Sequence, residues 1–191
     1  MTLVWRLQSD LFPMKALNRK IKFKKGINEY FHLNFDYIVS ENFPELDWLL
    51  VNYKLNKMAK EHKIEMHAFV MMSTHCHLLF KTHLQNENYF TDAILKELNI
   101  DICDESLVEP IQNLSQYLNS YKYIYRNPVM AGLVKRCEDY RFSSLHGLLG
   151  QSILQTQVID PLSIAQNVLH MLDWLNDNYQ KKLFHFNSAD T

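Results

Sequence analysis

Two histidines that stand two residues apart, His75 and His77, are the residues of this sequence best suited to do chemistry together. They lie in the stretch 71–80 (MMSTHCHLLF), which is apolar and has no helical period. Because alternate side chains of a strand share a face, a strand here would turn both imidazoles the same way. Such a pair can bind one metal ion, although histidines on strands are more often part of a core or a surface.

A third donor and a nucleophile stand further along the chain. Asn127 offers an amide oxygen, a hard ligand that suits Mg²⁺ or Mn²⁺, and imidazole tolerates Mn²⁺ and softer ions. Tyr123 lies one helical turn before Asn127, so the two side chains would be neighbours on a helix. A phenol is mostly protonated at neutral pH, so its attack on phosphorus needs help from a divalent cation that polarises the phosphodiester.

Both side chains depend on a helix that we predict over residues 110–127. With about 100° of rotation per residue, the apolar side chains and three tyrosines fall within about 80° either side of Tyr121. The other members of this core stripe are Ile111, Leu114, Tyr117, Leu118, Ile124 and Tyr125. Tyr123 falls on the polar face with Asn127, where core packing does not explain it, although ordinary surface tyrosines also occur. Pro128 is expected to end the helix near Asn127.

Three stretches are predicted as strands from their aromatic, β-branched and apolar content. They are residues 30–39, residues 64–72 and residues 75–82, the last of which carries His75 and His77. The short break at Ser73 and Thr74 favours a tight hairpin between the last two over one continuous bulged strand. His67, on the second of these strands, is interpreted as structural.

Helices are expected around these strands. A capping residue followed by Pro44 predicts a helix over residues 44–62. Residues 83–109 are polar and acidic, and we expect one short helix in them and otherwise loop. Asp160 and Pro161 predict the start of a last helix, which packs against the domain. Its apolar stripe comprises Ile164, Val168, Met171, Leu172 and Leu175.

The composition indicates one globular domain. Of the 191 residues 47% are hydrophobic, and no apolar run approaches the roughly 20 residues that a membrane span needs. The N-terminus lacks the apolar core of a signal peptide, so a cytoplasmic location is the default. Cys76, Cys103 and Cys137 are widely spaced, which predicts reduced thiols rather than disulfides or a cysteine zinc site.

The net charge of −1 conceals an uneven distribution of charge. A basic cluster near the N-terminus, which includes Arg19, Lys20, Lys22 and Lys24, could neutralise phosphates. A solvated charged segment is the alternative interpretation of this cluster. The near-neutral balance disfavours a protein committed to long duplex DNA.

Two of these segments resemble a known family. Residues 71–80 look like the His-hydrophobe-His (HUH) segment of single-tyrosine transposases, and residues 123–134 (YIYRNPVMAGLV) look like their tyrosine-helix segment. The closer match is the branch called REP-associated tyrosine transposases, whose sequence after that helix also resembles residues 140–144 with Gly150. The similarity covers about residues 28–150.

The resemblance implies an α+β fold, with a ferredoxin-like antiparallel sheet and helices on one face. The chain would divide into a basic N-terminal arm (1–27), the HUH domain (28–150) and a C-terminal helical extension (151–191). The implied activity is metal-dependent nicking and strand transfer of single-stranded DNA through a 5′-phosphotyrosine, by a monomer or a homodimer. Tyr123 would be the nucleophile, and His75, His77 and Asn127 would hold Mg²⁺ or Mn²⁺. Single-stranded or hairpin DNA would contact Arg19, Lys20, Lys22, Lys24, Lys122 and Arg126.

The chain differs from the family pattern between the histidine pair and the tyrosine, where residues 83–109 are short and acidic. This difference supports an alternative function, a catalytically impaired, domesticated HUH-fold protein that binds single-stranded DNA or nucleic-acid hairpins. A third hypothesis is that His75 and His77 hold a structural metal ion.

Overall fold

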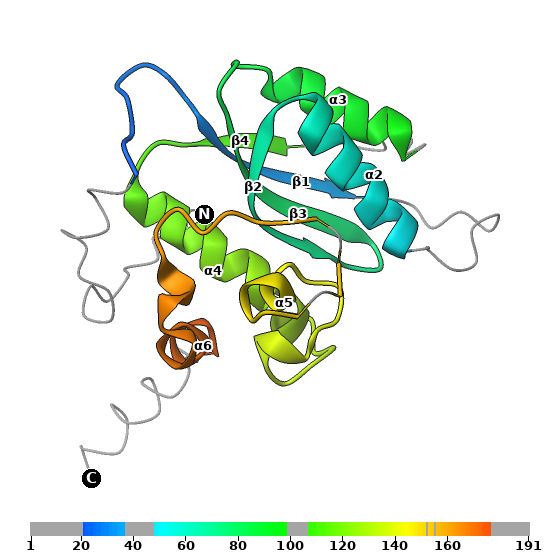
Figure 1. Ribbon diagram of the computed structural model, residues 1–191, viewed down its shortest axis with the longest axis vertical. Helices are drawn as coiled ribbons and strands as arrows, with labels where there is room; N and C mark the ends of the chain where they lie inside the picture. Colours follow the sequence, from blue (N-terminus) through cyan, green and yellow to red (C-terminus); the bar gives the residue numbers. More distant parts are fainter. Residues whose placement is uncertain (1–20, 37–47, 99–106, 152, 155, 177–191) are drawn as a thin grey trace, which may run out of the picture.

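The computed structural model describes residues 21–36, 48–98, 107–151, 153–154 and 156–176 (Figure 1). Predictions for Arg19, Lys20, Cys103 and the outer parts of the first strand and first helix therefore lie outside the described residues. The elements in chain order are β1 (Tyr30–Asp36), α2 (Trp48–Glu61), β2 (Ile64–Met71), β3 (His75–Thr82), α3 (Glu87–Glu97), β4 (Leu107–Ile111), α4 (Leu114–Met130), α5 (Leu145–Leu148) and α6 (Val168–Asn176), with short 3₁₀ turns at Cys137–Asp139 and Ile164–Gln166.

The strands form one antiparallel sheet in the order β2-β3-β1-β4. The succession β1-α2-β2-β3-α3-β4 is that of the ferredoxin-like fold, so the predicted α+β class is confirmed. The predicted hairpin is also confirmed, because β2 pairs directly with β3 and the Met72 amide donates to the His75 carbonyl across the turn at 2.8 Å.

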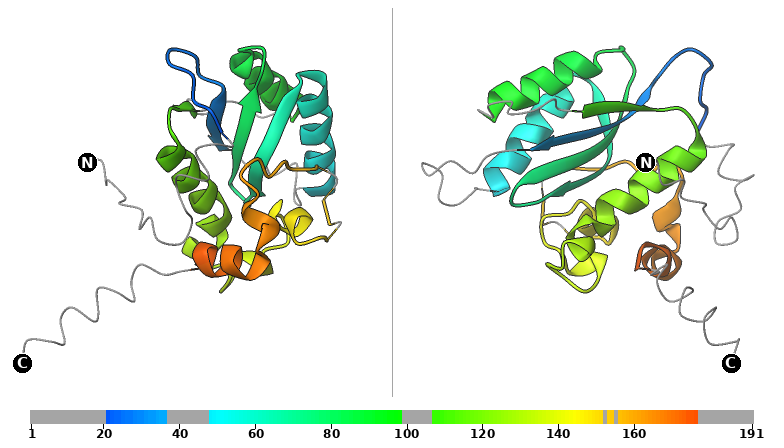
Figure 2. Two further views of the ribbon diagram at one scale, coloured as in Figure 1. Left: turned by 60° about the vertical axis from the view of Figure 1, so that its left-hand side comes forward. Right: turned by 180° about the vertical axis from the view of Figure 1, so that it is seen from behind.

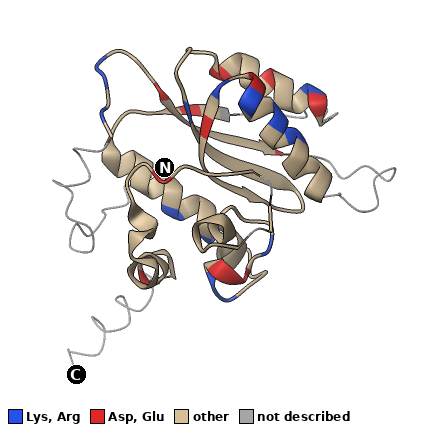
Figure 3. Ribbon diagram, in the orientation of Figure 1, with Lys and Arg blue, Asp and Glu red and all other residues tan. Residues whose placement is uncertain are grey.

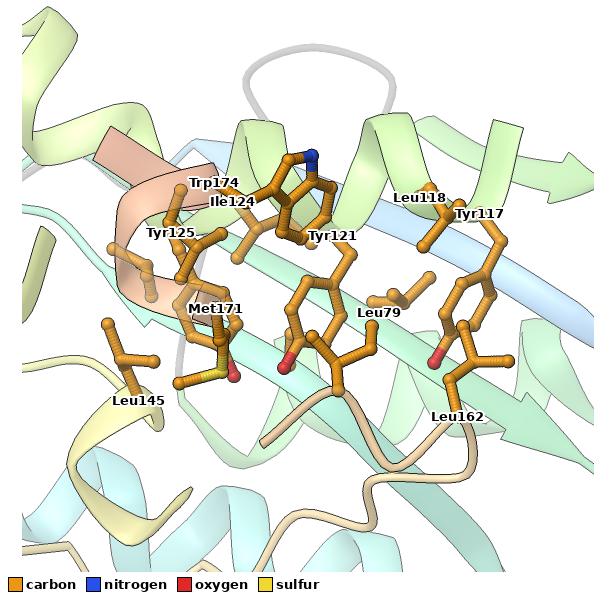
Figure 4. Packing of buried hydrophobic residues seen from close by; sticks show 14 of the residues in the cluster. Leu79, Tyr117, Leu118, Tyr121, Ile124, Tyr125, Leu145, Leu162, Met171 and Trp174 are labelled. Atoms are coloured by element: carbon orange, nitrogen blue, oxygen red, sulfur yellow. The ribbon is translucent and has the colours of Figure 1, made fainter. Parts of the chain in front are cut away.

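Helices cover both faces of this sheet rather than one (Figure 2). The two crossover helices α2 and α3 pack on one face, over a core that includes Phe31, Leu78 and Phe80. Helix α4 lies on the opposite face, where the three predicted core tyrosines pack with α6 (Figure 4). Helix α4 thus adds a second core to the ferredoxin-like unit.

Strand β4 corrects the prediction that residues 83–109 are loop apart from one helix and that a helix begins at Pro110. Ile111, assigned to the core stripe of that helix, instead pairs with Tyr30 in the sheet. Proline is compatible with an edge strand, and β4 pairs with β1 alone. Helix α4 begins only at Leu114, after Asn113 accepts a hydrogen bond from the Gln116 amide at 2.9 Å and so caps its first turn.

The predicted end of one helix at Pro128 and the predicted start of the last helix at Asp160 also differ from the structure. Pro128 lies inside α4, which continues to Met130, because a proline in the last turn forfeits only one backbone hydrogen bond. At the C-terminal side, the Asp160 carboxylate caps the 3₁₀ turn, not α6, by accepting from the Ile164 and Ala165 amides. Helix α6 therefore starts at Val168, which is 37% exposed and does not belong to the apolar stripe, whereas Met171 and Leu175 are buried.

Candidate functional site

The site lies where the C-terminal half of α4 crosses the start of β3. On β3, His75 and His77 alternate with the buried Cys76 and so face α4, as their spacing predicts. On α4, Asn127 is 7% exposed and reaches the sheet. The structure therefore brings together a histidine pair and an amide that are 50 residues apart in the chain.

The Asn127 carboxamide lies between the two imidazoles. Its Nδ2 is 2.7 Å from His77 Nε2, and its Oδ1 is 3.2 Å from His75 Nε2. On the outer side of the pair, the Nδ1 of His75 is 2.9 Å from the Thr74 hydroxyl. Each imidazole thus turns one nitrogen towards the same amide group.

Tyr123 borders this cluster from the exposed face of α4. Its ring meets the His77 ring edge-on, with ring centroids 5.2 Å apart, and it remains 41% exposed. The other tyrosines of the helix, Tyr117, Tyr121 and Tyr125, are at most 1% exposed, and burial raises the pKa of all three phenols. Of the four, only Tyr123 can meet a substrate, which agrees with the facial assignment from sequence.

His32 joins the site although no pattern in the sequence indicated it. Its Nε2 lies 3.3 Å from His77 Nδ1, and the two rings stack with centroids 5.3 Å apart. The His32 ring also meets Tyr123 edge-on at 6.0 Å. A single strand histidine carries no pairing information, because its neighbours depend on the register between β1 and β3.

Burial keeps the imidazoles of His32 and His77 neutral. It lowers the pKa of His77 to about 3, with smaller contributions from the neighbouring His32 and His75. Burial alone lowers the pKa of His32 to about 4. At neutral pH, His77 therefore keeps an unprotonated nitrogen that can serve as a ligand.

The donor set fits a divalent cation that takes nitrogen and oxygen. Neighbouring ligands of an octahedral ion at about 2.1 Å lie about 3 Å apart, close to the 3.2 Å between Asn127 Oδ1 and His75 Nε2. Among the described residues, no group of three or more histidine, cysteine, aspartate or glutamate side chains is arranged to hold a metal ion. A cation here would therefore rely on two imidazoles and one amide oxygen, with other positions left for substrate.

The predicted nucleic-acid-binding residues are scattered. Lys22 and Lys24 are exposed before β1, and Lys24 pairs with Glu29 at 2.6 Å. Lys122 was predicted on the polar face of its helix, but it is only 9% exposed because its ammonium lies 5.4 Å above the Trp174 ring. Arg126 is partly buried on α4. In Figure 3, the charged residues of α2 are mostly basic and those of α3 are mostly acidic.

Acidic side chains lie on the sheet face that carries the site. Asp36 pairs with His75 across the β1–β3 ladder, and Glu109 pairs with His32 across the β1–β4 ladder. Both are exposed. Directly paired residues share a face, so the surface of β1 and β4 beside Tyr123 carries negative charge.

None of the described helices combines the length and the apolar character needed to cross a membrane.

Comparison with known proteins gives a structural match. None of the known family models matches the chain, and no curated protein matches it in sequence. A solved structure of a REP-associated tyrosine transposase bound to a REP hairpin is similar, with a TM-score of 0.51 and 17% sequence identity. The match covers 75% of this chain and 91% of that chain. The chain therefore shares the fold of that transposase.

Proposed function

We propose that this protein nicks single-stranded DNA and transfers the cut strand through a covalent bond to Tyr123. The observation that carries the proposal is the meeting of one exposed tyrosine with a histidine pair bridged by Asn127. The fold supports it, because the similar transposase structure holds a DNA hairpin. Hairpin-forming single-stranded DNA is accordingly the proposed substrate.

In this reaction the Tyr123 hydroxyl attacks a DNA phosphorus and the bond from phosphorus to the 3′-oxygen breaks. The phenol loses its proton, the leaving oxygen gains one as a free 3′-hydroxyl, and the 5′-phosphate stays joined to the tyrosine. Attack by the 3′-hydroxyl of another strand reverses these steps and joins the two strands without an external energy source.

His75, His77 and Asn127 would hold the Mg²⁺ or Mn²⁺ ion. When bound, such an ion polarises the phosphodiester and stabilises the charge that develops on it. The chain contributes the positions of these donors and of Tyr123, which borders His77 and stays open to substrate. Exposed lysines such as Lys22, together with Arg19, Lys20 and Arg126, are proposed to contact DNA phosphates.

The test is covalent capture of DNA. The full chain is incubated with labelled single-stranded DNAs that contain short palindromes, with Mn²⁺ or Mg²⁺, and resolved on a denaturing gel. Wild type should form an adduct, and Tyr123→Phe and His77→Ala should not. Tyr89→Phe is the matched control, because Tyr89 is a 74% exposed tyrosine on α3. Absence of an adduct in wild type, or an equal adduct in Tyr123→Phe, would refute the proposal.

A second candidate is hairpin binding without cleavage. The exposed carboxylates Asp36 and Glu109 beside the site favour it, because negative charge there opposes approach of a phosphate. Tight binding of a hairpin, with no adduct in either metal, would support this function over the first. Loss of all affinity for single-stranded DNA would remove both.

A further inference from the structure

We infer that His32 is a positioning residue that fixes the proton of His77 on Nδ1 and so keeps Nε2 unprotonated, with a lone pair for the cation. The inference rests on the proposed function, because it assigns His32 a task in the proposed metal site. His32 touches neither Asn127 nor His75 in the contacts described above. Its ring meets those of His77 and Tyr123, so its link to the proposed cation site runs through His77.

The hydrogen bonds at both ends of His77 agree on one tautomer. A neutral imidazole carries one proton, on either Nδ1 or Nε2. At Nε2 the Asn127 Nδ2 group, 2.7 Å away, can only donate, so Nε2 must accept. At Nδ1 the His32 Nε2 lies 3.3 Å away and can accept the remaining proton. His77 is therefore held with its lone pair on the side of Asn127 and His75.

Sheet geometry explains why His32 can hold this position. In the β1–β3 ladder His32 pairs with Leu79 and His77 pairs with Asn34, so the two imidazoles are diagonal neighbours on one face. Strand β1 lies between β3 and β4, which fixes its backbone on both sides. The stacked ring of His32 also lies beside Tyr123, so it supports the nucleophile and the ligand together.

This arrangement follows a general pattern in metal proteins. A histidine ligand usually donates its second N–H to a neighbouring acceptor, which fixes the tautomer and the ring orientation. Removal of such an acceptor typically weakens metal binding by about 10- to 100-fold. His32 meets this description through its 3.3 Å contact to the outer nitrogen of His77.

The first measurement is the tautomer itself, read from two-bond ¹H–¹⁵N spectra of the metal-free full chain. In wild type and in His32→Gln, whose amide oxygen can still accept, the His77 proton should reside on Nδ1. In His32→Leu, which keeps only the Asn127 contact at Nε2, the share of His77 protonated on Nδ1 should fall. A His77 proton on Nε2 in wild type would overturn the inference, and this result does not depend on how well any variant folds.

The second measurement is Mn²⁺ affinity, from the electron paramagnetic resonance signal of the free ion. We expect about 10- to 100-fold weaker binding in His32→Leu, and a value for His32→Gln that is closer to wild type. His83→Leu is the matched control, because His83 is an exposed histidine bonded to Glu65 away from the site.

The outcomes separate the two proposals. Equal Mn²⁺ affinity in wild type and His32→Leu overturns the role of His32 and leaves the proposed function standing. Equal losses in His32→Leu and His32→Gln also overturn it, because any loss of the ring would then suffice. A wild-type chain that binds no Mn²⁺ and forms no DNA adduct overturns both.

Discussion

Acidification should destabilise this protein through His32, a partly buried neutral histidine. Its pKa is about 4 in the folded chain, against about 6.5 for an exposed histidine. As the pH falls below about 6.5, the unfolded chain takes up a proton that folded His32 does not, which favours unfolding. The stability contributed by the neutral ring is therefore present above about pH 6.5 and is lost as the pH falls towards 4.

The size of this loss follows from the two pKa values. One proton taken up by the unfolded chain alone changes the free energy of unfolding by about 1.4 kcal/mol per pH unit. Between about pH 7 and about pH 5, this difference persists over about 1.5 pH units, so His32 should account for about 2 kcal/mol. His77, whose pKa is about 3, adds a loss in the same direction.

The assay is urea unfolding at these two pH values, in the presence of a chelator so that metal binding does not contribute. The free energy of unfolding of His32→Gln should fall by about 2 kcal/mol less than that of wild type, because glutamine takes up no proton. Tyr123→Phe changes no imidazole and should keep the wild-type dependence. Equal losses in wild type and His32→Gln would show that His32 is not held neutral by burial.

Three further substitutions test the packing around the site, each by urea unfolding at neutral pH. Ser144→Ala should lower the free energy of unfolding by about 2 kcal/mol. The buried Ser144 hydroxyl bonds the Phe69 amide at 2.8 Å and the Tyr125 hydroxyl at 3.0 Å, and both groups would lose a partner. Lys122→Ala should lower the free energy of unfolding by about 1 kcal/mol, because the contact with Trp174 is lost. The same substitution should leave the salt dependence of hairpin affinity unchanged. A smaller salt slope would show that Lys122 contacts phosphate. Asp160→Ala should cost about 1 kcal/mol, since two amides of the 3₁₀ turn lose their acceptor, and an unchanged stability would contradict that capping role.

The sequence was informative where the signal was local. The apolar content of residues 64–72 and 75–82, with a two-residue break between them, was enough to predict the hairpin that carries the histidines. Helical spacing separated Tyr123 from the three buried tyrosines, because burial on one face repeats with the period of the helix. Both predictions depend on residues close together in the chain.

The parts that sequence missed depend on pairing between distant strands. Strand β4 is five residues long and contains Pro110, so its own residues favour a loop or a helix start, and its pairing with β1 decides the outcome. His32 has no local companion and gains its role only when β1 meets β3. Lys122 looked solvent-exposed because nothing in the spacing of α4 shows that Trp174 will cover it.

The geometry of the candidate site is determined largely by residues that do not touch it. Hydrogen bonds anchor α4 at two buried points: Tyr117 bonds His67 Nδ1 at 2.9 Å, and Tyr125 bonds Ser144 at 3.0 Å. These bonds fix the rotation of the helix, and a shift by one residue, about 100°, would carry Tyr123 away from His77. Since Asn127 lies on the same rigid helix, the buried tyrosines align the nucleophile and the amide ligand with β3 at once. Selection on the chemistry of this site would therefore act on the buried hydroxyls of α4 as well as on its exposed phenol.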